Sequence, residues 1–195
     1  MRVAMVSPSF PSAQCGISTY TNYLCESLSN WVDIDIVGSS RTCNLSTTIR
    51  EVSLAVRDAD CAHIQHEFSN YGYMGLWTIP LYNRLRKSNR PIITTIHELP
   101  NSSAKLKKDY IAFPYLRLVV ATILGCSRAV IVHSRDSYER LRLSKYAARV
   151  HIIPHGSVTT SSVESRVLDL HAPITIGCFG TIKENKGFHL LLPVL

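Results

Sequence analysis

The chain begins with the short apolar run RVAMVS (Arg2–Ser7), which a loop rich in serine and proline connects to Gly16. The run predicts a buried strand, because it is short and apolar and is stopped by Pro8. From Ile17 to Leu28, apolar and aromatic side chains return at helical spacing. The opening of the chain therefore predicts a strand–loop–helix unit, the building block of a parallel α/β sheet.

The same alternation continues along the chain. Further strands are predicted at Val32–Val37, Cys61–Gln65, Pro91–Ile96, Ala129–His133 and Val150–Ile153. Helices are predicted at Ser46–Val56, at Tyr73–Lys87 (bent by Pro80 or starting there), at Lys105–Cys126 (interrupted at Pro114), and from an N-cap at Ser134 through Lys145. The predicted fold is an α/β, Rossmann-like, doubly wound parallel sheet with helices on both faces.

The order of patterns divides the chain into three parts. Residues 1–156 form the Rossmann-like domain, and the polar stretch 157–172, rich in serine and threonine, is interpreted as a linker. Residues 173–195 begin a second βα domain, which we expect to be incomplete because the sequence stops inside its first helix.

Composition excludes several classes of protein. The chain has 195 residues, 46% hydrophobic and 18% charged, which excludes a disordered tail, a collagen-like repeat and a coiled coil. The net charge is +7, but the segment Arg84–Arg149 alone carries fourteen Lys and Arg against four acidic residues, a net of +10. This segment indicates either an anionic partner or an ordinary solvated basic face.

The cysteine pattern and the hydropathy bear on location. None of the six cysteines forms a C-x-x-C pair, and no signal-peptide pattern opens the chain. The longest apolar stretch near the middle, Leu118–Cys126, is too short to span a bilayer. We therefore expect a cytoplasmic protein with free thiols.

Ligands of parallel α/β sheets bind beyond the carboxyl ends of the strands, so the polar residues that follow the predicted strands are the candidate site. A lone histidine at such a place is either a structural residue or a ligand-binding one. The residues that follow or end the predicted strands form four neighbouring pairs: His66 and Glu67, His97 and Glu98, His133 and Ser134, and His155 and Gly156. Four strands followed by or ending in histidine are more than packing alone would require.

The motif His63-Ile64-Gln65-His66-Glu67 invites a metal interpretation, which its spacing does not favour. On a strand, His63, Gln65 and Glu67 point to one face, and Ile64 and His66 point to the other. The spacing is neither H-E-x-x-H nor a helical i, i+4 pair, so no metal site is expected here.

Two further loops suit an anion. The loop that ends at Gly16 presents backbone N–H groups at a helix start, and Lys186 and Gly187 open a helix after a tight turn. Either loop is equally consistent with a simple connection, and Lys186 with a solvated side chain.

Taken in order, these motifs resemble the GT-B glycosyltransferases of family 4, retaining enzymes that use nucleotide sugars. The resemblance covers nearly the whole chain: Met1–Pro8, Gly16 to Leu24, His63–Phe68, Pro91–Glu98, Ala129–Ser134, Ile152–Gly156 and Phe179–Gly187. His66-Glu67-Phe68 and Pro154-His155-Gly156 look most like a subgroup that includes mannosyltransferases. The sequence departs from the usual pattern at Cys15, where a glycine is common, and at Thr181, where an arginine is common.

The resemblance implies that the first domain binds the acceptor and the second binds the donor. It implies that Gly16 lies near the donor phosphates, that His97 is catalytic beside the transferred sugar, and that Lys186 and Gly187 hold the donor diphosphate. The remaining strand-end residues would contact donor or acceptor: His66, Glu67, Glu98, Ser134, His155 and Gly156. No metal or other cofactor is implied; the donor would be GDP-mannose or a UDP-sugar, and the acceptor a lipid, glycan or small-molecule hydroxyl.

Lys105, Lys107 and Lys108 lie beside Tyr110 and Phe113 within the basic segment. Cations interleaved with aromatic rings suit an anionic membrane surface, and no nucleic-acid motif surrounds them, so we expect peripheral binding to the inner face of a membrane rather than to nucleic acid.

Two other functions remain open from the sequence. The chain could be a non-catalytic acceptor-binding module, or a different Rossmann-like sugar-nucleotide enzyme such as an epimerase. The lack of a complete G-x-G-x-x-G after the first strand argues against a tightly bound dinucleotide. If the glycosyltransferase prediction holds, we expect the 195-residue chain alone to be inactive, because the donor half is incomplete.

Overall fold

A computed structural model describes residues 1–7, 10–11, 15–38, 44–72, 75–99, 107–156 and 190. The chain divides into two compact units, Met1–Gly156 and Ser157–Leu195. All the helices and strands described below belong to the first unit. The predicted linker and the start of a second domain, with Lys186 and Gly187, lie outside the described residues and stay predictions.

The first unit is built on a six-stranded sheet in which every neighbouring pair is parallel. The strand order is β2-β1-β3-β4-β5-β6. The strands are β1 (Arg2–Val6), β2 (Asp33–Val37), β3 (Cys61–His66), β4 (Ile92–Ile96), β5 (Ala129–Val132) and β6 (Val150–Ile152). The parallel α/β prediction is confirmed.

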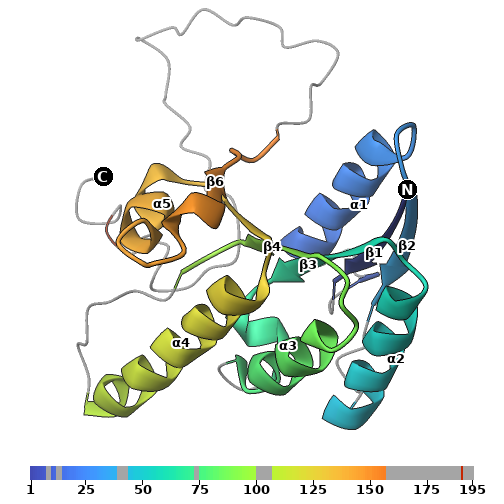
Figure 1. Ribbon diagram of the computed structural model, residues 1–195. Coiled ribbons are helices and arrows are strands. Elements are labelled where there is room, and N and C mark those ends of the chain that lie inside the picture. The colour runs from blue at the N-terminus through green and yellow to red at the C-terminus, as the bar shows by residue number, and fades with distance from the viewer. Residues whose placement is uncertain are drawn as a thin grey trace, which may run out of the picture. The chain divides into compact units, whose positions relative to one another are not determined.

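The helices that connect the strands are α1 (Gly16–Leu28), α2 (Leu45–Arg57), α3 (Thr78–Arg86), α4 (Lys107–Cys126) and α5 (Arg135–Leu141). Short 3-10 turns form at η1 (Phe68–Asn70) and η3 (Ala147–Arg149). Helix α1 lies on one side of the sheet, and α2, α3 and α4 lie on the other (Figure 1). This arrangement follows from right-handed crossovers. The chain moves across the sheet in one direction from β1 to β2, and then in the opposite direction from β2 past β1 to β3, β4 and β5.

Three helix predictions differ from the structure in detail. Helix α3 begins at Thr78, so Pro80 lies in its first turn, where a missing N–H costs no hydrogen bond. The predicted interruption at Pro114 is wrong, because α4 runs through it from Lys107 to Cys126. Interior proline forfeits one backbone hydrogen bond and bends a helix, but the turns on both sides can continue. Helix α5 stops at Leu141, and turns lead the chain back into β6.

The core lies between the sheet and the layer of α2, α3 and α4. Every residue of β3 is buried, as expected of a central parallel strand with helices on both faces. Ile64 and Ile96 pack in one cluster with Leu81 and Ile123 of the covering helices. The rigid centre of the sheet therefore fixes the carboxyl ends of β3 and β4, from which the candidate site is built.

Candidate functional site

A cavity of about 470 Å³ opens at the carboxyl ends of the strands. Gly16 and Ile17 reach it from the first turn of α1, Glu67 from the residue after β3, and His97 from the residue after β4. The complete lining is Cys15, Gly16, Ile17, Tyr20, Glu67, Ser69, Asn70, His97 and His155. The structure thus brings together four of the residues that the sequence placed in the site: Gly16, Glu67, His97 and His155.

The start of α1 gives the cavity a partially positive wall. The first backbone N–H groups of an α-helix have no partner within the helix, and the helix dipole adds partial positive charge at this end. No acidic residue in the first turn of this 13-residue helix offsets that charge. Apart from the neighbouring residues and the backbone of α1, no atom of the described residues lies within 4 Å of a Cβ placed on Gly16, so the described part of the chain leaves open space in front of the backbone here. An anionic group could approach it closely.

A network of hydrogen-bonded, buried polar side chains holds His97 in place. The Nε2 atom of His97 lies 3.0 Å from Oε1 of Gln65, a side chain with no exposed surface. The amide nitrogen of Gln65 donates to Sδ of Met5 at 3.3 Å and faces Nε2 of His63 at 3.4 Å. His63 continues the chain to Oγ1 of Thr95 at 2.8 Å. The side chain that faces the cavity is therefore held by residues of β1, β3 and β4.

The same hydrogen-bond network also fixes the protonation state of His97. Because Oε1 of Gln65 can only accept, Nε2 of His97 donates and Nδ1 keeps a lone pair. Burial, and after it the neighbouring His133, His155 and His63, together lower the pKa of His97 to about 3. The imidazole is thus neutral at physiological pH, with one nitrogen able to accept a hydrogen bond from a hydroxyl.

Three histidines from three strand ends gather around Tyr20. The ring of Tyr20 meets those of His97, His133 and His155 edge-on, with centroids 5.0, 5.4 and 5.2 Å away. His133 and His155 are stacked at 3.7 Å between ring centroids. His133 Nδ1 lies 2.8 Å from the carbonyl oxygen of Ile153, to which it donates. The cluster joins β4, β5 and β6 at the edge of the cavity.

Glu67 lines the cavity and also caps the short turn η1. Its carboxylate accepts from the backbone N and Oγ of Ser69, at 3.3 and 3.2 Å, and so caps η1. Burial raises its pKa, the hydrogen bonds from Ser69 oppose this, and the charge of Glu98 adds to the rise. Glu98 itself is exposed and does not line the cavity.

His66 is placed differently from the other candidates. Its side chain has no exposed surface and stacks on the ring of Tyr71, with centroids 4.8 Å apart, while Phe68 meets it edge-on. Among the described residues neither of its ring nitrogens has a hydrogen-bond partner. Its carbonyl oxygen accepts a hydrogen bond from the backbone N of His97 at 3.1 Å, and His66 is not among the residues that line the cavity. The structure therefore does not bring the His66 side chain to the cavity.

The other predicted residues are placed as follows. Ser134 is the N-cap of α5, where its Oγ accepts from the backbone N of Ser137 at 3.1 Å. Gly156 is exposed beside His155. Lys107 and Lys108 are the first two residues of α4, but their side chains are not described, and Lys105 lies outside the described residues. The membrane prediction at these lysines therefore stays a prediction.

Sequence reasoning missed the contributions of Gln65 and Tyr20 to the site and the stacking of His133 on His155. The signal for Gln65 was present, because strand alternation places it on the same face as Glu67. Tyr20 belongs to the apolar stripe of the helix predicted after Gly16, and nothing in the sequence distinguishes it from the other members of that stripe. His133 was noted as a strand end, but only the sheet order brings it beside His97 and His155.

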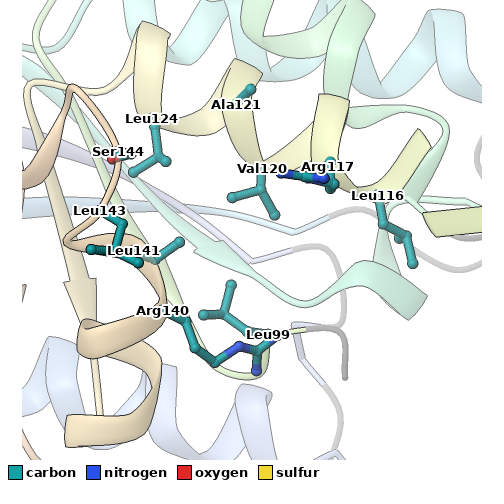
Figure 2. A pocket seen from close by; sticks show the side chains of 10 residues that line it. All are labelled: Leu99, Leu116, Arg117, Val120, Ala121, Leu124, Arg140, Leu141, Leu143 and Ser144. Atoms are coloured by element: carbon teal, nitrogen blue, oxygen red, sulfur yellow. The ribbon is translucent and has the colours of Figure 1, made fainter. Parts of the chain in front are cut away.

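A second, apolar cavity of about 580 Å³ lies between α4 and α5 (Figure 2). Figure 2 shows Val120 and Leu124 of α4 on one side of it and Leu141 on the other. Leu99, two residues after His97, also lines it, and two arginines, Arg117 and Arg140, contribute to its wall. None of its lining residues belongs to the strand-end cavity.

Among the described cysteines, Cys25, Cys61 and Cys126 are free thiols. A search of the described helices for a membrane span found none that combines the necessary length and apolar character.

Comparisons with known proteins give a structural likeness but no match in sequence. No protein-family model matches the chain, and no curated protein sequence matches it. Among solved structures, the chain is similar to the crystal structure of Anabaena Alr3699/HepE in complex with UDP, with a TM-score of 0.49 and 11% sequence identity. The similarity covers 80% of this chain and 44% of that one, so the chain spans less than half the length of this neighbour.

Proposed function

We propose that this chain contributes the acceptor-side domain of a nucleotide-sugar glycosyltransferase. One observation carries the proposal: the first turn of α1, Glu67 and a neutral, held His97 line a single cavity at the carboxyl ends of parallel strands. The ordered motifs in the sequence that resemble family 4 GT-B enzymes support it independently.

The geometry suits the reacting part of a nucleotide sugar. A diphosphate or its leaving oxygen would be stabilised by the N-terminal N–H groups of α1, in front of Gly16. His97, donating through Nε2 to Gln65, would accept a hydrogen bond from a sugar hydroxyl at Nδ1. The buried chain through Gln65 and His63 restricts the ring, so orientation is set before the ligand binds.

The finer points rest on the resemblance. Transfer would proceed with retention at the anomeric carbon, and Lys186 and Gly187 would bind the donor diphosphate. For the acceptor, the apolar cavity of α4 and α5 favours a molecule with a hydrocarbon portion, because Leu99, two residues beyond His97, is among its lining residues. We therefore favour a lipid-linked acceptor over a small polar one.

The proposal is tested by adding UDP-glucose or GDP-mannose to the ¹⁵N-labelled chain and following its backbone amides by NMR. We expect saturable shifts at Gly16, Ile17, Glu67 and His97. UDP alone should reproduce the shifts at Gly16 and Ile17, and the sugar should be required for the shift at His97.

Two results would contradict the proposal. One is the absence of saturable shifts with either nucleotide sugar at high ligand concentration, because the N–H groups in front of Gly16 should bind the phosphates even without contacts from Lys186 and Gly187. The other is a set of shifts confined to residues outside the cavity. Shifts produced by glycans alone, without any response to nucleotide sugars, would instead favour a non-catalytic acceptor-binding module.

A further inference from the structure

The three strand-end histidines have the arrangement of a metal-binding set. One ring nitrogen from each of His97, His133 and His155 lies within 4.8 Å of one from each of the others. In a tetrahedral zinc site with Zn–N bonds of about 2.0–2.1 Å, the ligand nitrogens lie about 3.4 Å apart. His155 is exposed on the loop after β6, so its side chain has room to close this difference.

The hydrogen bonds around two of these rings leave one nitrogen of each ring available. His133 donates from Nδ1 to the carbonyl oxygen of Ile153, and His97 donates from Nε2 to Oε1 of Gln65. Each ring therefore has a lone pair on its other nitrogen. Metal-bound histidines typically donate their second N–H to a carbonyl or carboxylate in this way, which fixes the tautomer and the ring orientation.

One ring nitrogen of the cluster is buried without a hydrogen-bond partner among the described residues. Nε2 of His133 is fully buried and has no hydrogen-bond partner among the described residues. A buried polar atom without a partner costs about 1–3 kcal/mol unless something binds it. This nitrogen belongs to a ring of the three-histidine cluster, and no donor in the described part of the chain satisfies it.

We propose that His97, His133 and His155 bind a divalent transition-metal ion, with Zn²⁺ as the preferred cation. Neutral imidazole nitrogens suit zinc and its neighbours, whereas Mg²⁺ and Ca²⁺ prefer oxygen ligands. Three histidines leave a fourth coordination position open, and His97 and His155 both line the strand-end cavity. An ion here would present that position to an oxygen ligand in the cavity, such as water or a phosphate. This site was not expected from the sequence, because its three residues are separated by 36 and 22 positions.

The test is calorimetric titration of Zn²⁺ into the 195-residue chain, purified without any histidine tag. We expect one zinc ion per chain. His133→Ala and His155→Ala should each weaken binding at least tenfold, and His151→Ala should bind as the wild type does. His151 is the matched control because it lies on β6, is exposed and is outside the cluster. Circular dichroism melting of each variant checks that it is folded.

The six cysteines of the chain are competing zinc ligands, and substitution with Co²⁺ separates the two cases. A site of three imidazoles should give visible d–d bands without thiolate-to-cobalt charge transfer. The ring nitrogens of His97 and His133 should also shift in ¹H–¹⁵N spectra when Zn²⁺ is added to a diamagnetic sample. No stoichiometric zinc binding, a thiolate signature, or full binding by folded His133→Ala and His155→Ala would each overturn the proposal. The ion would occupy the Nδ1 lone pair of His97 that the proposed function assigns to a sugar hydroxyl, so the ion and that hydroxyl are alternative ligands of this ring. These experiments contain no nucleotide sugar, so they can fail while the proposed transferase function stands, and the reverse also holds.

Discussion

The two faces of strand β3 carry the same residue type in two different environments. On the face toward α1, His63 and Gln65 belong to a hydrogen-bonded chain that ends at His97. On the opposite face, Ile64 and His66 pack in the apolar layer, and His66 lies among the rings of aromatic residues. Two histidines three positions apart therefore differ completely in what they do, because strand alternation sends them to different faces.

The comparison shows how this sheet separates stability from function. The apolar face offers tight packing and no route to solvent. The polar face is also buried, but its side chains are hydrogen-bonded to one another. His63 is bonded to Gln65 and Gln65 to His97, which lines the cavity. Buried polar groups are tolerated when they are paired in this manner, and such pairing fixes side-chain orientation.

The largest expected effect is on the apolar face. Ile64→Ala should lower the free energy of unfolding by about 2–5 kcal/mol, because the side chain is fully buried at the centre of the core. Urea unfolding measures this. The resonances of the His97 ring should remain close to those of the wild type, and a large change there would show that the two faces are not independent.

A smaller loss is expected on the polar face. Gln65→Leu should cost about 1–3 kcal/mol, because it leaves Nε2 of His97 and Nε2 of His63 without their amide partner. Unlike Ile64→Ala, it should change the tautomer populations of His97, which ¹⁵N chemical shifts of the ring report. Unchanged ring shifts would remove Gln65 from its positioning role.

The apolar face should also make stability depend on pH. Burial lowers the pKa of His66 to about 3 from 6.5, so between these values the unfolded chain binds a proton that the folded chain does not. The contribution of neutral His66 to the free energy of unfolding is therefore fully present above pH 6.5 and decreases as the pH falls toward 3. From pH 7 to pH 5 the loss from His66 alone is about 2 kcal/mol.

His66→Leu isolates this contribution, since it removes the titrating group at similar volume. The stability difference between wild type and His66→Leu should shift by about 2 kcal/mol in favour of the variant on going from pH 7 to pH 5. Urea titrations at the two pH values measure the difference. A pH-independent difference would mean that His66 is protonated or hydrated in the folded protein.

Much of this fold could be predicted from the sequence. Short apolar runs that alternate with amphipathic stretches indicated all six strands to within one or two residues. The continuity of α4 through Pro114 could not be predicted, since local propensity alone does not show whether the flanking turns will hold a helix together. The early end of α5 likewise depends on where the chain must turn to reach β6.

The site was predictable one residue at a time but not as a constellation. Strand ends indicated His97 and His155, and the alternation of β3 already separated His66 from Glu67. The contact of Tyr20 with three histidines requires the positions of α1, β4, β5 and β6 relative to one another. No spacing in a single sequence contains that information.

The most direct test of the strand-end site is the affinity of the His97→Ala chain for UDP-glucose and GDP-mannose, measured together with its melting temperature and beside His151→Ala. His97 is half-buried at the cavity, where water can replace its hydrogen bond to Gln65. We predict at least tenfold weaker binding of the nucleotide sugar that the wild type binds better, with a melting temperature within a few degrees of the wild type. His151→Ala should match the wild type in both. Unchanged affinity with a clearly lowered melting temperature would contradict the functional role of His97 and leave it as a structural histidine.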